Sequence, residues 1–335
     1  MTIHATRRAV PTAANSDRAI ATAYNQAGDE YISYADGNPR LLFAFDGRYG
    51  YGDRQIWELL DTRLRALRVS GAETVRILDL GCGPGTWLRR VVTRARELGF
   101  RHIMARGFDI AEDQIRRAHQ LSETLRTRPG VNLRFEIGDI CEPYPEADGS
   151  VDLCLCLCGV LNHLTAPDLG PVLREIGRVT SGDFVTSVRA IGSTPTVYVG
   201  AVEDARSFRQ DNLNNRLEVE FKNGRRICLN SHLFEAAELR ALVAPVFAVK
   251  DLFGLDLFHG RFAEDDRWNP RQCKATDGFR SELDRLEKIY CREASFIDHA
   301  THLLLIATPR EQAAKAILPV QRVLPARRER PAAGI

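Results

Sequence analysis

The sequence predicts an α/β fold built on a mainly parallel β-sheet. An apolar strand at residues 75–80 runs into the glycine-rich turn 81–85, and an amphipathic helix follows at 87–98. Beyond this turn, strand and helix patterns alternate along the chain, as is typical of parallel sheets. With 335 residues, 44% of them hydrophobic, the chain can bury a full core.

The N-terminal part lacks this alternation. Residues 1–20 show little apolar periodicity and are predicted to be flexible. An aromatic-rich segment at 24–34 precedes a helix at 53–68 that has leucine and isoleucine on one face. We therefore predict that residues 21–73 form a helical cap over the main sheet.

The main domain is predicted to span residues 74–308. Its further strands are expected at 102–109, 131–137, 151–157, 184–189, 247–252 and 302–307, and its helices at 112–126, 166–179 and 234–242. The strand at 151–157 is largely apolar, which indicates burial on both faces of the sheet. Binding sites in such sheets lie beyond the carboxyl ends of the strands, where the strand order reverses.

Two insertions interrupt the alternation, at residues 191–232 and 258–300. The first contains Asn223-Gly224 between two apolar runs, which predicts a β-hairpin. The second contains a predicted helix at 279–290. The fold class is therefore α/β with a hairpin and helical insertions.

The composition is that of an ordinary globular protein with a net charge of only +2. Arginine far outnumbers lysine, which a GC-rich bacterial genome explains more simply than nucleic-acid binding. Residues 309–335 are predicted to be a flexible basic tail. No stretch approaches 18 apolar residues, and the N-terminus lacks the apolar region of a signal peptide, so we expect a cytoplasmic protein without membrane contact.

The eight cysteines predict neither disulfides nor a metal site. No CxxC pair occurs, and Cys154, Cys156 and Cys158 alternate along one strand. They would lie on one face in a row too straight to surround a tetrahedral ion. We expect buried thiols that act as small hydrophobic groups.

The glycine turn is the most informative motif. Its spacing is GxGxG rather than the GxGxxG of a dinucleotide loop. Asp79 comes before it, and a carboxylate there would repel a pyrophosphate and attract a cation. The motif favours a cationic nucleoside, whereas the alternative is a tight strand-to-helix turn that uses glycine for its backbone alone.

The strand, the acid and the glycine turn together resemble the first motif of the class I S-adenosylmethionine-dependent methyltransferases of the small-molecule type. The resemblance implies a Rossmann-like seven-stranded sheet whose last strand is antiparallel, and S-adenosylmethionine as cofactor. In that family the glycines let the backbone approach the amino acid part of the cofactor, and the acid holds its ammonium group. These positions are Asp79, Gly81, Cys82, Gly83 and Gly85.

The resemblance also implies two acids at later strand ends. Asp109 would accept both ribose hydroxyls, and Ile110 would pack against the adenine. Asp139 would accept a hydrogen bond from the adenine amino group, with Ile140 beside it. The local alternatives are a helix N-cap at Asp109 and an ordinary turn at Asp139.

After the fourth strand, the family places groups that face the methyl group and the acceptor, here from Cys158 onward. His163 could take a proton from the acceptor because its unperturbed pKa lies near neutrality. Asn162 could orient the acceptor. Alternatively, His163 packs against the next helix and Asn162 ends a turn. In that case, positioning and desolvation of an amine acceptor could supply the catalysis without a base.

Aromatic residues of the N-terminal segment are candidates for a lid over the cofactor. Aromatic faces attract cations, and in several family members an N-terminal tyrosine closes over the cofactor, so Tyr24 and Tyr31 are assigned this role. The alternative is that they anchor the cap as core residues. Location alone places His232, Phe234 and Trp268 near the acceptor.

The sequence thus predicts a methyltransferase that moves a methyl group to nitrogen, oxygen or carbon of a small organic acceptor by in-line displacement. The alternatives are an RNA or protein methyltransferase and a non-catalytic methyltransferase-like binding subunit. An RNA or protein methyltransferase lacks support because no (Asp/Asn)-Pro-Pro-aromatic motif follows the fourth strand and no basic patch is evident. We expect no nucleic-acid partner, and the sequence is compatible with a homodimer.

Overall fold

The computed structural model describes residues 19–25, 41–45, 49–193, 205–262 and 278–310. The predictions for Tyr31, Trp268 and the tail at 311–335 lie outside these residues, as do those for residues 1–18. All structural statements below concern the described residues.

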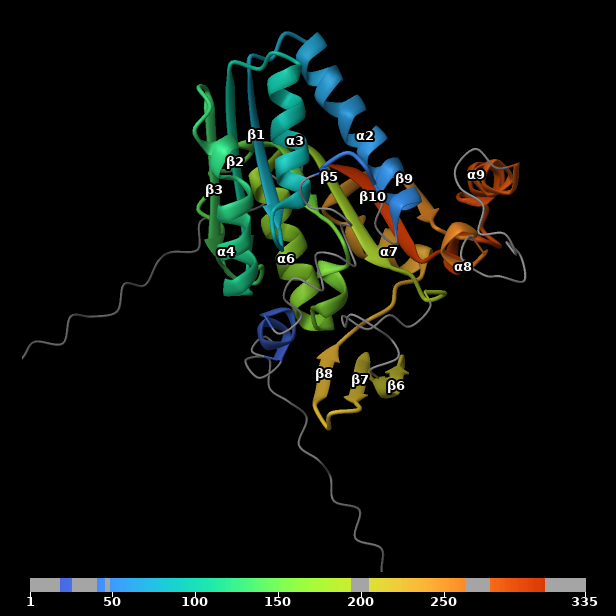
Figure 1. Ribbon diagram of the computed structural model, residues 1–335. Coiled ribbons are helices and arrows are strands. Elements are labelled where there is room, and N and C mark those ends of the chain that lie inside the picture. The colour runs from blue at the N-terminus through green and yellow to red at the C-terminus, as the bar shows by residue number, and fades with distance from the viewer. Residues whose placement is uncertain (1–18, 26–40, 46–48, 194–204, 263–277, 311–335) are drawn as a thin grey trace, which may run out of the picture.

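A seven-stranded sheet forms the centre of the molecule (Figure 1). Its strands are β1 (Thr74–Leu80), β2 (His102–Asp109), β3 (Val131–Ile137), β4 (Val151–Cys156), β5 (Thr180–Arg189), β9 (Phe247–Leu255) and β10 (His302–Pro309). They follow the order β3-β2-β1-β4-β5-β10-β9. Strands β1 to β5 pair in parallel, whereas β10 is antiparallel to both β5 and β9. The predicted sheet with an antiparallel last strand is confirmed.

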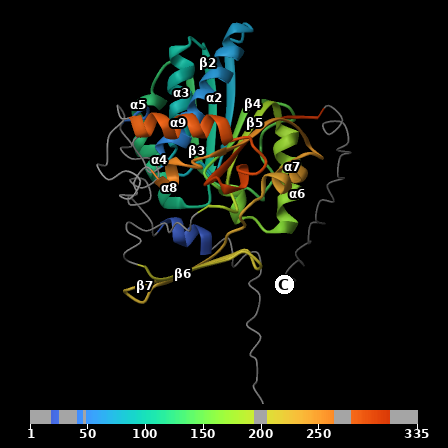
Figure 2. The same cartoon turned by 90° about the vertical axis from the view of Figure 1, so that its right-hand side faces the viewer.

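Helices cover both faces of this sheet. They are α2 (Gly50–Val69), α3 (Thr86–Glu97), α4 (Glu112–Leu121), α5 (Glu123–Arg126), α6 (Ala166–Val179) and α7 (Ala236–Val243). Figures 1 and 2 show α2, α3 and α4 on one face and α6 and α7 on the other. The predicted helix at 112–126 is interrupted at Ser122, which separates α4 from α5.

Helix α2 belongs to the helical layer of the sheet. Its residues Ile56, Leu60 and Leu64 are buried in the main hydrophobic core, and the helix packs against α3 and β9. It therefore does not lie over the carboxyl ends of β1 to β4. That position is taken by the short helix of residues 19–25.

Strand β4 is buried on both faces, as predicted from its apolar sequence. Cys154 and Cys156 are fully buried within it. Cys158 is different, because it lies beyond the strand end with a positive φ of 61° and is exposed. The prediction that all three thiols are buried in one row is wrong for Cys158, since the chain leaves the extended conformation before it.

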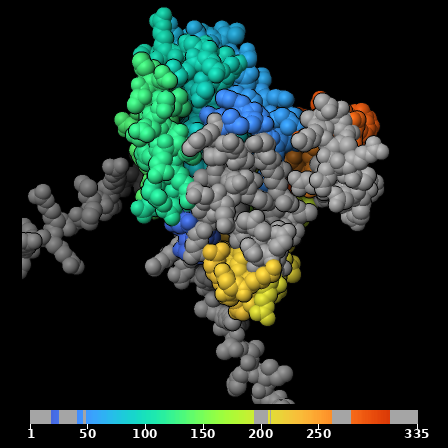
Figure 3. Space-filling view, viewed as in Figure 1, coloured from blue at the N-terminus to red at the C-terminus, as the bar shows by residue number. Residues whose placement is uncertain are grey.

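The first insertion forms a separate antiparallel sheet of three strands. These are β6 (Ala205–Asp211), β7 (Arg216–Phe221) and β8 (Arg226–Asn230), in the order β6-β7-β8. The predicted hairpin turn lies between β7 and β8, with Gly224 at a φ of 82°. The small sheet lies beyond the carboxyl ends of the main strands, near the helix of residues 19–25 (Figure 1), and its outer surface is yellow in Figure 3.

The second insertion lies at the β9 edge of the main sheet (Figure 1). It contains α8 (His259–Phe262), α9 (Gly278–Tyr290) and the 3₁₀ turn η3 (Ile297–His299). The helix predicted at 279–290 is confirmed as α9. The buried carboxylate of Glu287 on α9 accepts three backbone N–H bonds, from Leu257, Phe258 and His259. These bonds tie the insertion to the end of β9.

Candidate active site

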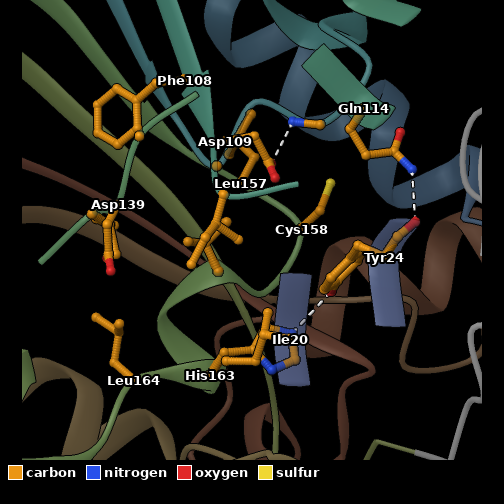
Figure 4. Close-up of a pocket in the computed structure, with 16 residues that line it drawn as sticks. Ile20, Tyr24, Phe108, Asp109, Gln114, Asp139, Leu157, Cys158, His163 and Leu164 are labelled. Carbon is orange, nitrogen blue, oxygen red and sulfur yellow. Dashed lines mark hydrogen bonds between the residues drawn. The ribbon is translucent and has the colours of Figure 1, made fainter. Parts of the chain in front are cut away.

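A cavity opens at the carboxyl ends of β1 to β4, where the strand order reverses. Its empty space, including the open mouth, is about 730 Å³. Figure 4 shows side chains that reach it from several segments of the chain. It is lined by Ile20, Tyr24, Gly81, Gly83, Phe108, Asp109, Ile110, Gln114, Gly138, Asp139, Ile140, Leu157, Cys158, Val160, His163 and Leu164.

The glycine turn forms one wall of this cavity. Gly81 and Gly83 line it, and both have positive φ, of 64° and 51°. A Cβ added at Gly83 would meet nothing within 4 Å, so the turn leaves open space there for a ligand. Gly85 serves packing instead, because a Cβ there would lie 2.6 Å from the ring of Phe135. Cys82 is buried, and its backbone N–H donates to the carbonyl of Phe108.

Asp109 is held at the cavity by backbone donors. Its Oδ2 accepts the N–H of Gly83 at 2.9 Å, and its Oδ1 accepts the N–H of Ala111 at 2.8 Å. Burial raises the pKa of Asp109, and these backbone bonds oppose the rise. Ala111, not Asp109, is the N-cap of α4. The carboxylate is therefore fixed to the glycine turn, and Ile110 lines the cavity beside it.

Asp79 lies behind the glycine turn and does not line the cavity. Its side chain is buried, with 2% exposure, and its Oδ2 has no hydrogen-bond partner among the described residues. Burial, and then the charge of Asp109, raise the pKa of Asp79 to about 8. A cation placed near such a buried carboxyl group favours its ionised form and lowers its pKa.

A third acid, Asp139, lies at the end of β3. It lines the cavity together with Gly138 and Ile140, and its Oδ1 accepts the N–H of Cys141 at 2.8 Å. Phe108 and Leu157 add apolar surface to the same region. The predicted cofactor residues Gly81, Gly83, Asp109, Ile110, Asp139, Ile140 and Cys158 are thus brought together, whereas Asp79, Cys82 and Gly85 support the turn from behind.

The opposite wall carries a tyrosine–histidine pair. The hydroxyl of Tyr24 lies 2.9 Å from Nε2 of His163, and the two rings meet edge to face (Figure 4). Nδ1 of His163 lies 2.9 Å from the carbonyl oxygen of Asn230. A carbonyl oxygen can only accept, so Nδ1 carries the proton. In the neutral ring Nε2 then accepts a hydrogen bond from the Tyr24 hydroxyl.

The helix of residues 19–25 presents Tyr24 to the cavity. The side chain of Gln114 donates to the carbonyl of Tyr24 at 3.1 Å, and the side chain of Asn25 accepts the N–H of Asp113 at 3.0 Å. Ile20 packs on the other side, in a cluster with Ala23 and Leu229. These contacts hold the helix between α4 and β8.

Asn162 does not reach the cavity. Its side chain is 1% exposed, and its amide bonds both the N–H and the carbonyl of Arg189 and also the carbonyl of His232. The prediction that it contacts the acceptor is therefore not supported by its position. His232 and Phe234 also lie outside the lining, because Phe234 is buried and His232 is bonded to Asn215 and Glu238.

Several lining residues were not predicted from the sequence. Phe108 and Leu157 directly precede Asp109 and Cys158, so their places at strand ends could have indicated them. Ile20 lies in a segment predicted to be flexible, and nothing in its local sequence marks it. The residues missed were Ile20, Phe108, Gln114, Gly138, Leu157, Val160 and Leu164.

Comparison with known proteins agrees with this geometry. Residues 77–183 match the family model of a methyltransferase domain. An uncharacterized 37.1 kDa protein of transposon TN4556 from Streptomyces fradiae is 34% identical over 111 residues, which are 32% of this chain and 29% of that protein. Magnesium-protoporphyrin O-methyltransferase of Rhodobacter capsulatus is 29% identical over 113 residues, 34% of this chain and 44% of the relative. The matched regions thus span less than half the length of these relatives.

Among solved structures, magnesium protoporphyrin IX methyltransferase from Synechocystis PCC 6803 with bound SAM aligns with a TM-score of 0.48 at 13% identity. The alignment covers 90% of this chain and 100% of that one. Residues 77–183 therefore match a methyltransferase domain, and the strand order and the glycine turn are those of the class I S-adenosylmethionine-dependent type. S-adenosylmethionine is the cofactor of this class.

The residues present fit this cofactor. Gly83 leaves open space beside the turn, and Asp79 has a buried oxygen without a partner among the described residues. Asp109 and Asp139 present carboxylates at the next two strand ends. Acids and an open glycine turn suit a cationic nucleoside better than a phosphate. In the described part of the chain, no group of three His, Cys, Asp or Glu side chains could hold a metal ion.

Among the described helices, none combines the length and the apolar character that a membrane span requires.

Proposed function

We propose that the protein transfers the methyl group of S-adenosylmethionine to a small organic acceptor by in-line displacement, and that the acceptor atom is a hydroxyl oxygen. The observation that carries this proposal is the Tyr24–His163 pair, which faces the same cavity as Gly83 and Asp109. The described lining therefore combines groups for a cofactor with a group that can take a proton.

S-adenosylmethionine, when bound, supplies an electrophilic methyl carbon on a sulfonium. Asp79 would neutralise the ammonium group from behind the turn, Asp109 would accept the ribose hydroxyls, and Asp139 the adenine amino group. Gly81 and Gly83 would allow the close approach of the backbone. Cys158 and Ile110 line the same cavity and would also contact the cofactor.

His163 is suited to act as the base. Burial lowers its pKa, the bond to the Asn230 carbonyl partly offsets this, and Arg189 lowers it further. The ring is therefore neutral at pH 7, with its lone pair on Nε2. Tyr24 occupies that lone pair in the structure described, and an acceptor hydroxyl would replace it or pass its proton through the tyrosine.

A hydroxyl acceptor follows from this base, whereas a carboxylate has no proton to lose at pH 7. A hydroxyl becomes a better nucleophile when it loses its proton during attack, whereas a neutral amine already has a lone pair. The Rhodobacter capsulatus relative is named an O-methyltransferase, which supports the same choice. The apolar side chains of Ile20, Val160 and Leu164 beside the pair favour an acceptor with an apolar body.

The experiment is methyl transfer from methyl-labelled S-adenosylmethionine into a size-fractionated extract of the source organism. We expect label in small organic molecules. The labelled product should resist mild base and release labelled methyl iodide with hydriodic acid, as a methyl ether does. Release of labelled methanol by mild base would indicate a methyl ester and would contradict the proposal. Label in RNA or protein alone, or on nitrogen or carbon, would contradict the proposal. Absence of transfer with intact cofactor binding would indicate a binding subunit.

A further inference from the structure

The end of β8 contacts the residue proposed as the base. Asn230 is the last residue of this strand and lies 67 residues after His163. Its backbone carbonyl oxygen accepts the proton of His163 Nδ1 at 2.9 Å. Its side-chain amide donates to the carbonyls of His163 and Leu164 at 3.0 and 2.8 Å. One residue therefore holds both the ring and the backbone of His163.

These bonds determine which nitrogen of the ring is free. Because the Asn230 carbonyl fixes the proton on Nδ1, the lone pair lies on Nε2, which points toward Tyr24 and the cavity. The two amide bonds keep the 3₁₀ turn η1 (Val160–His163) beside the strand end. Without them, η1 and the Asn230 carbonyl can separate, and the ring loses its acceptor.

The preceding residue of β8 contacts the other partner of the pair. Leu229 is buried against Ile20 and Ala23 on the helix of residues 19–25, which carries Tyr24. Successive side chains of a strand point to opposite sides. Leu229 thus packs on the helix of Tyr24 while Asn230 bonds the turn of His163, and the strand sets the spacing between the two.

The strand end is itself fixed. Ser231 donates its N–H to the carbonyl of Asn215, and its own carbonyl accepts from the side chain of Gln210. The N–H of His232 donates to the carbonyl of Asn162 at 2.8 Å. Backbone and side-chain amide hydrogen bonds therefore join the insertion sheet to η1.

We propose that Asn230 is a positioning residue for methyl transfer, which holds His163 in its Nδ1–H tautomer and aims Nε2 at Tyr24 and the acceptor. The role in catalysis rests on the proposed function, whereas the tautomer does not. In this proposal the first insertion completes the active site of the main domain. Its strand β8 thus helps to position the catalytic groups.

The first test is the ¹⁵N spectrum of the histidine rings in the wild-type protein, with the His163 signals assigned by their loss in His163→Gln. We expect a protonated Nδ1 and an unprotonated Nε2 at pH 7. A protonated Nε2 would overturn the proposal. This reading needs no acceptor, so it remains valid if no methyl transfer is found and the proposed function fails.

The second test compares Asn230→Asp and Asn230→Ala with Asn223→Ala, a control in the exposed turn of the same hairpin. The Asp variant keeps the shape of Asn230 but loses both N–H donors and adds a negative charge near His163. Among the described residues, the charge of Arg189 lowers the pKa of His163, and the hydroxyl of Tyr24 is the titratable group that contacts the His163 ring. The Asp variant should therefore move the acid limb of the kcat profile to higher pH.

For both Asn230 variants we expect kcat to fall by about tenfold or more, with the KM for S-adenosylmethionine changed by less than about twofold. The Ala variant should also show Nε2–H character in the ¹⁵N spectrum. Asn223→Ala should match the wild type. Unchanged kcat, unchanged pH profile and an unchanged tautomer in folded Asn230→Asp would overturn the proposal.

Discussion

The two walls of the cavity are built in different ways. On the side proposed for the cofactor, Asp109 is the last residue of β2, and Gly83 and Asp139 lie within three residues of the ends of β1 and β3. Neighbouring backbone N–H groups hold the two carboxylates. On the acceptor side, Tyr24 and His163 are 139 residues apart and meet only through an N-terminal helix and an inserted sheet. The first wall is a property of the sheet, whereas the second depends on insertions around it.

This difference suggests that the two walls can be disabled separately. Changes on the cofactor side should weaken binding of S-adenosylmethionine, and changes on the acceptor side should slow turnover.

The largest effect is expected for His163→Ala. Loss of the base should lower kcat about a hundredfold or more, with cofactor affinity nearly unchanged. Because the pKa of His163 is lowered from 6.5, the wild-type kcat should fall to half of its maximum only at a pH below 6.5. Steady-state kinetics across pH measures both. The control is His119→Ala, a histidine of α4 that does not line the cavity. Equal kcat in His163→Ala and the control would remove His163 from the mechanism.

The next effect is expected for Asp109→Ala. A lost charge-assisted hydrogen bond costs about 1.5–3 kcal/mol, so the Kd for S-adenosylmethionine should rise about 10- to 100-fold. Asp113→Ala, an acid on α4 that does not line the cavity, should bind like the wild type. Calorimetry of both variants tests this, and equal affinities would contradict the ribose assignment.

A smaller effect, about tenfold, is expected from proton linkage at Asp79. Its pKa of about 8 means that it is mostly protonated at pH 7, and a bound ammonium group would favour the ionised form. Cofactor affinity should therefore rise about tenfold between pH 6 and pH 7, where the ammonium group keeps its proton, and binding should release a proton to the buffer. In Asp79→Asn this pH dependence should disappear. A slope that persists in the variant would show that another group is responsible.

The smallest effect is expected for Tyr24→Phe. The variant keeps the packing of the ring but loses the hydroxyl that bonds His163, so kcat should fall about three- to tenfold. Tyr290→Phe on α9 is the matched control. An increase in KM for the cofactor without a change in kcat would instead place Tyr24 among the cofactor contacts.

The contrast between the walls also explains what the sequence could predict. The glycine turn, Asp109 and Asp139 could be predicted to lie at one site because their places depend on local order along the chain, a strand followed by a turn. Strand β6 was not predicted, because its polar residues give only a weak strand pattern. Its pairing with β7 supplies the stability that the local sequence lacks.

On the acceptor side, the sequence identified Tyr24 and His163 but not their pairing. It also assigned an acceptor contact to Asn162, whose amide instead joins Arg189 to His232. Asn230 could not be predicted at all, since an asparagine at the end of a hairpin strand has no local signal for catalysis. Such roles depend on contacts between residues far apart in the chain.

The central claim is that one wall binds the cofactor and the other serves the acceptor. Calorimetric titration of S-adenosylmethionine into the wild type, Asp109→Ala and His163→Ala tests it most directly. We predict one bound molecule per chain in the wild type, the same affinity in His163→Ala, and much weaker binding in Asp109→Ala. No binding to the wild type, or loss of affinity in His163→Ala with full affinity in Asp109→Ala, would contradict the account.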